Sequence, residues 1–305
     1  MAFTAKDVAE LRKQTGCGMM DCKNALVASN GDFEAAVKFL REKGMAATAK
    51  KADRIAAEGL VDIMTVGNVT AMVEVNSETD FVAKNATFQE FVKDVLKTII
   101  ANKPADVEAL LASKFIEGEG TVADALAEKT YKIGEKLSIR RFNIVEGTVS
   151  TYIHGLGATG VIVSFDTDVA EKDGFAECAK NVALQVAAMP VAYLDKESVP
   201  ASVLEEEKAI LLKQMEQDPK MAGKPQQVLE NIVKGKLGKY YENNCLLEQS
   251  YVKDDSMSVG KYVASVAKEL GGSIQVTGFV RYDKGEGLEK REEDFAAEIA
   301  KMVQG

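Results

Sequence analysis

Side chains that could perform chemistry are few and scattered in this chain. Cysteines stand at positions 17, 22, 178 and 245 without forming a CxxC pair, and His154 is the only histidine. A zinc site needs a clustered set of such ligands, so the spacing predicts neither a metal site nor a disulfide. A general base at His154 would need a nucleophile and an orienting acid, which the sequence does not identify. We expect no cofactor and no catalytic residues, with His154 as an exposed turn residue or a contact residue.

Sequence motifs for nucleotide binding or hydrolysis are missing as well. The sequence contains no phosphate loop, dinucleotide fingerprint, nucleophile elbow or HExxH motif. The run Gly285–Gly287 lacks the residues that would complete a phosphate-binding loop, so it predicts an ordinary loop. These observations favour a protein that acts by binding another protein.

Length and charge narrow the kind of partner. The 305 residues suffice for two or three domains, and 47 acidic against 38 basic residues give a net charge of −9. This charge argues against nucleic acid or a membrane surface as the main partner and favours a protein with basic patches. The start of the chain lacks a signal-peptide pattern, and no apolar run approaches the roughly 20 residues of a membrane-spanning helix. We expect a cytoplasmic protein.

An internal repeat spans the middle of the chain. Six residues recur 88 positions later: Gly59, Val61, Val73, Val75, Thr79 and Asp80 as Gly147, Val149, Val161, Val163, Thr167 and Asp168. An apolar helix face recurs 87 positions later: Phe88, Phe91, Val92, Val95, Leu96 and Ile99 as Phe175, Cys178, Ala179, Val182, Ala183 and Val186. A closing strand also recurs: Ser138, Ile139 and Phe142 as Ser273, Ile274 and Phe279. The repeat predicts two copies of one α+β unit, each an antiparallel sheet with helices on one face.

The segment Thr79–Val82 is the strongest candidate for a partner contact, and the repeat divides it. The second copy, Thr167–Ala170, keeps the Thr-Asp pair and lacks the aromatic residue. The shared pair therefore predicts a structural role, in which a side-chain oxygen of Thr79 or Asp80 caps a helix start. Phe81 is open to two interpretations: it packs under the following helix, or it is exposed as a wedge that enters a partner.

Residues 4 to about 43 predict three short helices. The first begins with the capping residues Thr4 and Asp7 and ends at Thr15-Gly16. The second is predicted to bury Met19, Cys22, Ala25 and Leu26. The third begins near Asp32, ends with Gly44 as its cap and carries an apolar stripe of Phe33, Ala36, Val37 and Leu40. A bundle this small is typical of a docking module.

Alternating residues from Val61 to Val75 predict a β-hairpin with a Gly67-Asn68 turn. Residues 84 to 101 predict a helix, and Ile139 to Val145 a third strand. The second copy is interrupted by two helices with a reversal between Asp218 and Pro225, which predicts an antiparallel hairpin. Its apolar residues are Leu204, Leu211 and Met215 on one helix and Val228, Leu229, Ile232 and Val233 on the other. After a strand from Ile274 to Tyr282, a last helix displays Phe295, Ile299, Met302 and Val303.

The predicted fold class is α+β, with six segments along the chain. They are a three-helix docking module (1–44), a basic, helical linker (45–58), the first half of a core (59–146), its second half (147–198 and 241–284), a helical hairpin inserted in it (199–240) and a C-terminal helical module (285–305).

The chain resembles the elongation factor Ts family over essentially its whole length. The resemblance rests on motifs in a fixed order: Leu11-Arg12, Thr15–Lys23, Ala25-Leu26, Asn30–Asp32, Glu74–Asn76, Thr79–Lys84, Tyr152–Gly155, Gly223–Pro225, Val276–Tyr282 and Gly285–Gly287. It implies an N-terminal module like a ubiquitin-associated (UBA) domain, a core of two related halves, a coiled-coil hairpin and a C-terminal helix.

The resemblance also implies a function in translation elongation. Members bind elongation factor Tu in its GDP-bound and nucleotide-free forms and act as guanine-nucleotide exchange factors without covalent chemistry. By resemblance, Asp80 and Phe81 enter the GTPase domain of the partner beside its magnesium site, and His154 is a partner contact. The module around Leu11, Met19 and Met20 docks on that domain, as does the C-terminal helix. The sequence leaves open whether one or two copies of each subunit assemble.

Two other classes stay open from the residues alone. An adaptor would use residues 4–43 as a docking module and the core as a scaffold. A small-molecule enzyme would work at Asp80 and His154. An exchange factor captures a GTPase that GDP releases, whereas an enzyme turns over a substrate without a protein partner.

Overall fold

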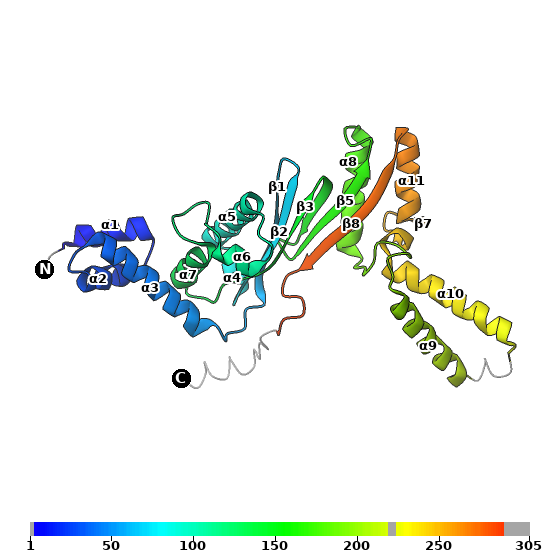
Figure 1. Ribbon diagram of the computed structural model, residues 1–305, viewed down its shortest axis with the longest axis horizontal. Coiled ribbons are helices and arrows are strands. Elements are labelled where there is room, and N and C mark those ends of the chain that lie inside the picture. Colours follow the sequence, from blue (N-terminus) through cyan, green and yellow to red (C-terminus); the bar gives the residue numbers. More distant parts are fainter. Residues whose placement is uncertain (1–2, 219–223, 290–305) are drawn as a thin grey trace, which may run out of the picture. The chain divides into compact units, whose positions relative to one another are not determined.

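The computed structural model describes residues 3–218 and 224–289 (Figure 1). The described chain divides into two compact units. The first contains residues 3–144, 155–159 and 282–289, and the second contains Val145–His154 and the described part of Gly160–Arg281. The elements confirm the α+β class. The predicted division into six segments stays a prediction.

The predicted N-terminal helices are α1 (Ala5–Thr15), α2 (Met19–Ala28) and α3 (Phe33–Lys51). Thr4 and Asp7 form the capping box that starts α1, and Gly16 ends it with a positive φ of 66°. Their buried core consists of Val8, Leu11, Cys17, Cys22, Ala25, Leu26, Ala36 and Leu40. Cap residues and apolar spacing together therefore define this part of the fold.

Two predictions for these helices are wrong. Met19 is not buried; as the first residue of α2 its side chain is 46% exposed. Gly44 does not cap α3, because the helix continues through it to Lys51. Gly44 is buried where α3 packs on α7 (Val122–Ile133), and a Cβ atom there would lie 3.3 Å from the carbonyl oxygen of Ala127. A glycine that permits close helix packing has the same sequence pattern as a glycine cap.

The first sheet has the strand order β1-β2-β3 and, apart from the last two residues of β3, lies in the first unit. Its strands are β1 (Glu58–Val66), β2 (Val69–Ser77) and β3 (Ser138–Glu146). The antiparallel pairing of β1 with β2 across the Gly67-Asn68 turn confirms the predicted hairpin. β3 confirms the predicted third strand.

Helices cover this sheet and form its core. The very short α4 (Asp80–Ala83) leads into α5 (Ala86–Asn102), which buries all six predicted apolar residues. The sequence predicted neither α6 (Val107–Ala112) nor α7, although Thr121 and Asp124 form a capping box at the start of α7. The core between sheet and helices includes Val73, Val75, Val82, Phe88, Phe91, Leu96 and Leu126.

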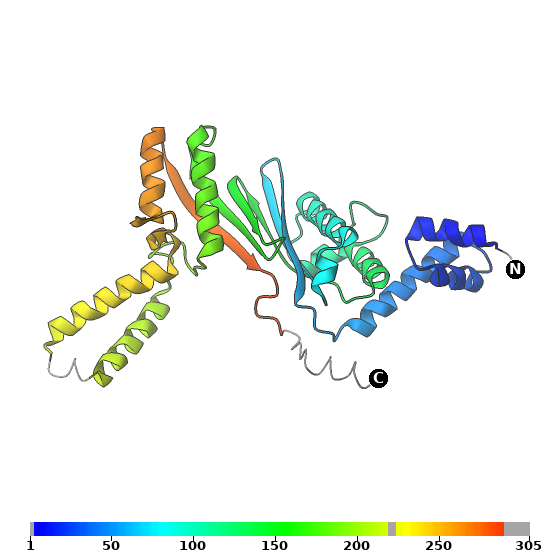
Figure 2. The same ribbon diagram turned by 180° about the vertical axis from the view of Figure 1, so that it is seen from behind.

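The second sheet has the strand order β4-β5-β8 and repeats the first. Its strands are β4 (Thr148–His154), β5 (Thr159–Thr167) and β8 (Ile274–Asp283). α8 (Asp173–Ala188) and α11 (Val259–Leu270) pack against each other and complete a separate core (Figure 2). The short η1 (Leu246–Glu248), β6 (Ser250–Tyr251) and β7 (Asp254–Ser258) precede α11. The predicted repeat is confirmed.

The inserted helices are α9 (Ala201–Gln217) and α10 (Gln226–Asn244), which run antiparallel in both views (Figures 1 and 2). Leu211 and Met215 are buried as expected. Val228, one of the predicted apolar residues, is exposed, and Leu237 is buried.

Parts of two predictions lie outside the described residues. They are the reversal at 219–223 and the last helix with Phe295, Ile299, Met302 and Val303. In the part of the chain that the structure describes, no helix has both the length and the apolar character needed to cross a membrane.

Candidate functional site

Phe81 is an exposed aromatic residue on the turn between β2 and α5. It is the second residue of α4, and 78% of it is exposed. Lys84 Nζ lies 5.8 Å from the centre of its ring. Val82, the next residue, is buried in the core of the first sheet. Packing of Phe81 under the following helix is therefore wrong, and Val82 anchors the turn instead of facing a partner.

Glu135 holds the backbone that precedes Phe81. Thr79 is the N-cap residue of α4, but its side chain makes no capping hydrogen bond. The Thr79 hydroxyl and backbone N–H instead donate to the two oxygens of Glu135, at 2.7 and 2.9 Å. The capping role predicted for Thr79 is wrong because a carboxylate from another part of the chain accepts these protons.

Asp80 adds a negative charge beside the ring. Its carboxylate accepts a hydrogen bond from Lys84 Nζ at 2.6 Å, and both side chains are at least half exposed. This hydrogen bond is the main reason that the pKa of Asp80 is lowered. The Asp80 carboxylate binds Lys84 Nζ and its own backbone N–H, so the capping of following N–H groups predicted for Asp80 is not seen either. The turn therefore presents an ionised carboxylate and an aromatic ring side by side.

A shallow groove adjoins Phe81. It is lined by residues from the end of α1, from the turn and from α7: Gly16, Phe81, Val82, Asn85, Thr87, Lys129, Lys132 and Ile133. Lys132 forms an ion pair with Glu128 on the same helix. The N-terminal helices and the Phe81 turn thus contribute to one surface of the first unit.

The equivalent turn of the second half is built differently. The Thr167 hydroxyl accepts a hydrogen bond from the backbone N–H of Val169 at 3.1 Å and donates to the carbonyl oxygen of Ser273 at 2.7 Å. Asp168 accepts a hydrogen bond from the N–H of Ser273 at 2.6 Å, which lowers the pKa of Asp168. Val169, which stands where the first half has Phe81, is buried. In this half the Thr-Asp pair has a structural role, but it does not cap a helix start, because α8 begins at Asp173 with Lys172 as its N-cap.

His154 ends β4 in the second unit and is exposed, as predicted for a turn residue. Its Nδ1 lies 3.1 Å from the hydroxyl of Tyr152. Among the described residues this hydroxyl, and no carboxylate, is its hydrogen-bond partner.

The residues predicted as contacts on the N-terminal helices divide into two groups. Met19 and Met20 are exposed on α2, and Met20 is the more exposed of the two. Leu11 is fully buried in the core of the three helices. Leu11 therefore supports the module from inside, and its prediction as a surface contact is wrong.

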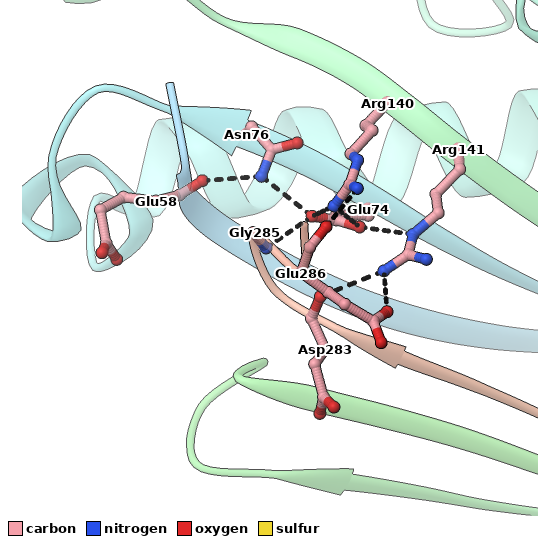
Figure 3. A network of polar contacts seen from close by, with 8 residues as sticks. All are labelled: Glu58, Glu74, Asn76, Arg140, Arg141, Asp283, Gly285 and Glu286. Atoms are coloured by element: carbon pink, nitrogen blue, oxygen red, sulfur yellow. Dashed lines mark hydrogen bonds and ion pairs between the residues drawn. The ribbon is translucent and has the colours of Figure 1, made fainter. Parts of the chain in front are cut away.

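A buried carboxylate that the sequence analysis did not single out organises the first unit (Figure 3). Glu74 on β2 is completely buried and accepts hydrogen bonds from Arg140 Nη1 at 3.0 Å and Arg141 Nε at 2.6 Å, both on β3. It also accepts from Asn76 Nδ2 at 3.0 Å and from the backbone N–H of Gly285 at 2.8 Å. Burial acts to raise the pKa of Glu74, but these hydrogen bonds together lower it.

The same network fixes the chain that follows β8. Arg141 Nη2 donates to the carbonyl oxygen of Asp283 and to the carboxylate of Glu286, each at 3.1 Å (Figure 3). Gly285 has a φ of 69°, and a Cβ atom there would lie 2.2 Å from the carbonyl oxygen of Ala57. The Gly285–Gly287 run is therefore a turn, as predicted, and only glycine fits at its first position.

The described residues contain no cluster of three or more histidine, cysteine or acidic side chains that could hold a metal ion. All four cysteines are free and buried. Burial raises the pKa of the Cys178 and Cys245 thiols to about 11. These thiols stay protonated near neutral pH, which does not favour a nucleophilic role.

Comparisons with known proteins show which family this chain is similar to. The family model described as Elongation factor TS matches residues 78–286. Elongation factor Ts of Syntrophotalea carbinolica is 46% identical over 99% of this chain and 100% of that protein. Elongation factor Ts of Clostridium kluyveri is 46% identical over 99% of each, and that of Magnetococcus marinus is 44% identical over the whole of both. The fold and these matches define a translation elongation factor. The chain belongs to the elongation factor Ts family.

Proposed function

We propose that the chain is a guanine-nucleotide exchange factor that binds elongation factor Tu and promotes the release of GDP. The observation that carries the proposal is Phe81, a large apolar side chain that is 78% exposed on a turn fixed from both sides. An exposed aromatic residue on a fixed turn is typical of a side chain that a partner buries. Membership of the elongation factor Ts family supports elongation factor Tu as that partner.

The proposed mechanism uses binding energy to weaken a nucleotide site. A GTPase holds GDP through backbone amides and a Mg²⁺ ion around the phosphates. Each loss of about 1.4 kcal/mol from the bound state speeds release roughly tenfold. Phe81 acts as a wedge that displaces the elements holding the ion, and the exposed carboxylate of Asp80 perturbs the surroundings of the ion. No covalent step is required.

Linkage makes the effect reciprocal. A factor that weakens GDP binding must itself bind more weakly when GDP is present, by the same factor. The nucleotide-free form of the partner therefore binds this chain most tightly. Entry of GTP then releases the chain for another round.

Further contacts are proposed around this centre. Met19, Met20 and His154 are exposed side chains that fit a contact role, whereas Leu11 and Val82 support the surface from the core. We also propose a UBA-like docking module in residues 1–44, a coiled-coil hairpin in residues 199–240 and a C-terminal helical docking module in residues 285–305. The proposed compartment is the cytoplasm. Complexes with one or two copies of each subunit both fit this proposal.

Release of a fluorescent GDP from elongation factor Tu tests the proposal directly. We expect the release rate in a stopped-flow experiment to rise with the concentration of this chain and then to saturate. Excess GDP should release the chain from a pull-down on elongation factor Tu. A release rate that does not change at any concentration would contradict the proposed function.

A further inference from the structure

We propose that Glu135 is a positioning residue that holds Phe81 in the orientation needed for exchange. The inference rests on the proposed function of Phe81. Glu135 follows Gly134, the C-cap of α7, and its two carboxylate oxygens accept protons from the N–H and the hydroxyl of Thr79. Thr79 is the residue from which α4 starts, so both hydrogen bonds fix the backbone two residues before Phe81.

A second carboxylate, that of Glu78, strengthens the contact between the Phe81 turn and the segment at Glu135. Here the acceptor belongs to the turn and the donor to the other segment. Glu78 accepts a hydrogen bond from the backbone N–H of Lys136 at 2.5 Å and one from Arg54 Nη1 at 3.1 Å. Its side chain is only 15% exposed. The segments 78–79 and 135–136 therefore bind each other reciprocally, each through a carboxylate of its own. Charge-assisted hydrogen bonds of this kind are stronger than neutral ones.

The Phe81 turn needs such support because it has little of its own. α4 is four residues long, and so short a helix is not stable through its internal hydrogen bonds. Val82 anchors the turn in the core, but the neighbouring Phe81 ring is exposed. Thr79 and Val82 are thus held on either side of Asp80 and Phe81. A side chain that is held in its bound orientation loses less conformational entropy on binding.

The second half of the core shows a different solution where no aromatic residue is presented. There Asp168 and Thr167 bind the backbone of Ser273, at the start of the closing strand. Leu270 stands three residues before Ser273, as Glu135 stands three residues before Ser138. The reciprocal contacts of Glu135 and Glu78, which we call the carboxylate clamp, are therefore found in the half that exposes Phe81. This links the clamp to the presentation of the ring.

Fluorescence anisotropy can measure the local mobility of the Phe81 turn in the absence of a partner. The chain contains no tryptophan, so Phe81→Trp introduces a single reporter. We expect Glu135→Gln, added to this variant, to give a faster local phase in the anisotropy decay. Asp168→Asn removes the corresponding charge from the other turn and is expected to leave the decay unchanged. Far-UV circular dichroism and thermal midpoints check folding, and Glu135→Asp, which keeps the charge but shortens its reach, serves as a second test variant.

Exchange kinetics with Phe81 intact complete the test. We expect Glu135→Gln to lower the maximal rate of GDP release roughly tenfold, while the concentration for half-saturation changes less than about twofold. A general loss of folding would change both. An unchanged anisotropy decay would overturn the positioning role, and so would a faster decay with an unchanged maximal rate. If Phe81→Ala leaves release unchanged, the proposed function fails, while the decay still reports separately on the clamp.

Discussion

The two halves of the core share one pattern and differ at the turn between strand and helix. In the first half, the residue after the Thr-Asp pair is the exposed Phe81; in the second, it is the buried Val169. The first turn is held by Glu135, and the second by the backbone of Ser273. A duplicated unit has thus kept one turn for packing and uses the other to present a side chain.

A second difference lies within the strands. Glu74 on β2 corresponds to Ile162 on β5, and both are completely buried. The first half keeps its carboxylate because Arg140, Arg141 and Gly285 satisfy it. The second half has an apolar side chain at the same place. The comparison predicts that the two halves respond differently to the same kinds of substitution.

The largest effect is expected for Glu74→Gln. The neutral amide replaces one acceptor oxygen by an NH2 group, which faces the N–H donors that this oxygen bound, so at least one donor is left unpaired. We expect a loss of about 3 kcal/mol in the free energy of unfolding. Urea unfolding measures this loss. Ile162→Val is the matched control and should cost about 1 kcal/mol. Equal losses for the two variants would contradict the role of the buried carboxylate.

Val169→Ala is expected to have the next largest effect. The substitution leaves a cavity in the core of the second half and should lower the free energy of unfolding by about 2 kcal/mol. Phe81→Ala, at the equivalent exposed position, should lower it by less than about 0.5 kcal/mol. Urea unfolding of both variants makes the comparison. Equal stability losses would show that the two turns do not differ as described.

The same two variants should rank in the reverse order when the rate of GDP release is measured. We expect Phe81→Ala to slow stimulated GDP release by at least roughly tenfold, which corresponds to about 1.4 kcal/mol. Val169→Ala should leave the release rate of the folded chain close to that of the unchanged protein. Stopped-flow release of a fluorescent GDP measures both. If the two variants slow release equally, the difference between the turns has no functional meaning.

The smallest expected effect is that of acidic pH on the stability contributed by Glu74. Because the pKa of Glu74 is lowered from its ordinary value of 4.5, its contribution to stability is complete above that pH and is lost as the pH falls through the lower, folded value. Glu74→Gln cannot show this loss. The stability difference between the two proteins in urea should therefore shrink as the pH falls below 4.5. A difference that is constant with pH would argue against an ionised Glu74.

Much of the fold could be predicted from local signals. The Thr4 cap, the Gly67-Asn68 turn and the apolar face of α5 each depend on neighbouring residues, and all three are confirmed. α7 was missed although its capping box at Thr121 is such a signal. Gly44 was misassigned as a helix cap. A glycine is needed there because of the close contact with Ala127, which lies far along the chain.

The candidate site shows the same limit more clearly. The repeat singled out Phe81, because its counterpart Val169 lacks the aromatic ring, but repeat comparison could not decide whether Phe81 is exposed. The partners of Thr79 and Glu74 are Glu135 and Arg141, more than fifty residues away in the sequence. Spacing does not report such distant pairs. Leu11 and Val82 were predicted as contacts for a similar reason, since a motif does not show which of its side chains point inward.

The buried Glu74 also has a consequence for how a duplicated chain folds. Two similar sheets offer two similar edges, and the closing strands β3 and β8 could in principle exchange places. Arg140 and Arg141 follow Ile139 on β3, whereas Gln275 and Val276 follow Ile274 on β8. Pairing of β2 with β8 would leave the carboxylate of Glu74 buried without its arginines, which is strongly unfavourable. We therefore expect the charge of Glu74 to favour pairing of β2 with β3 over pairing with β8.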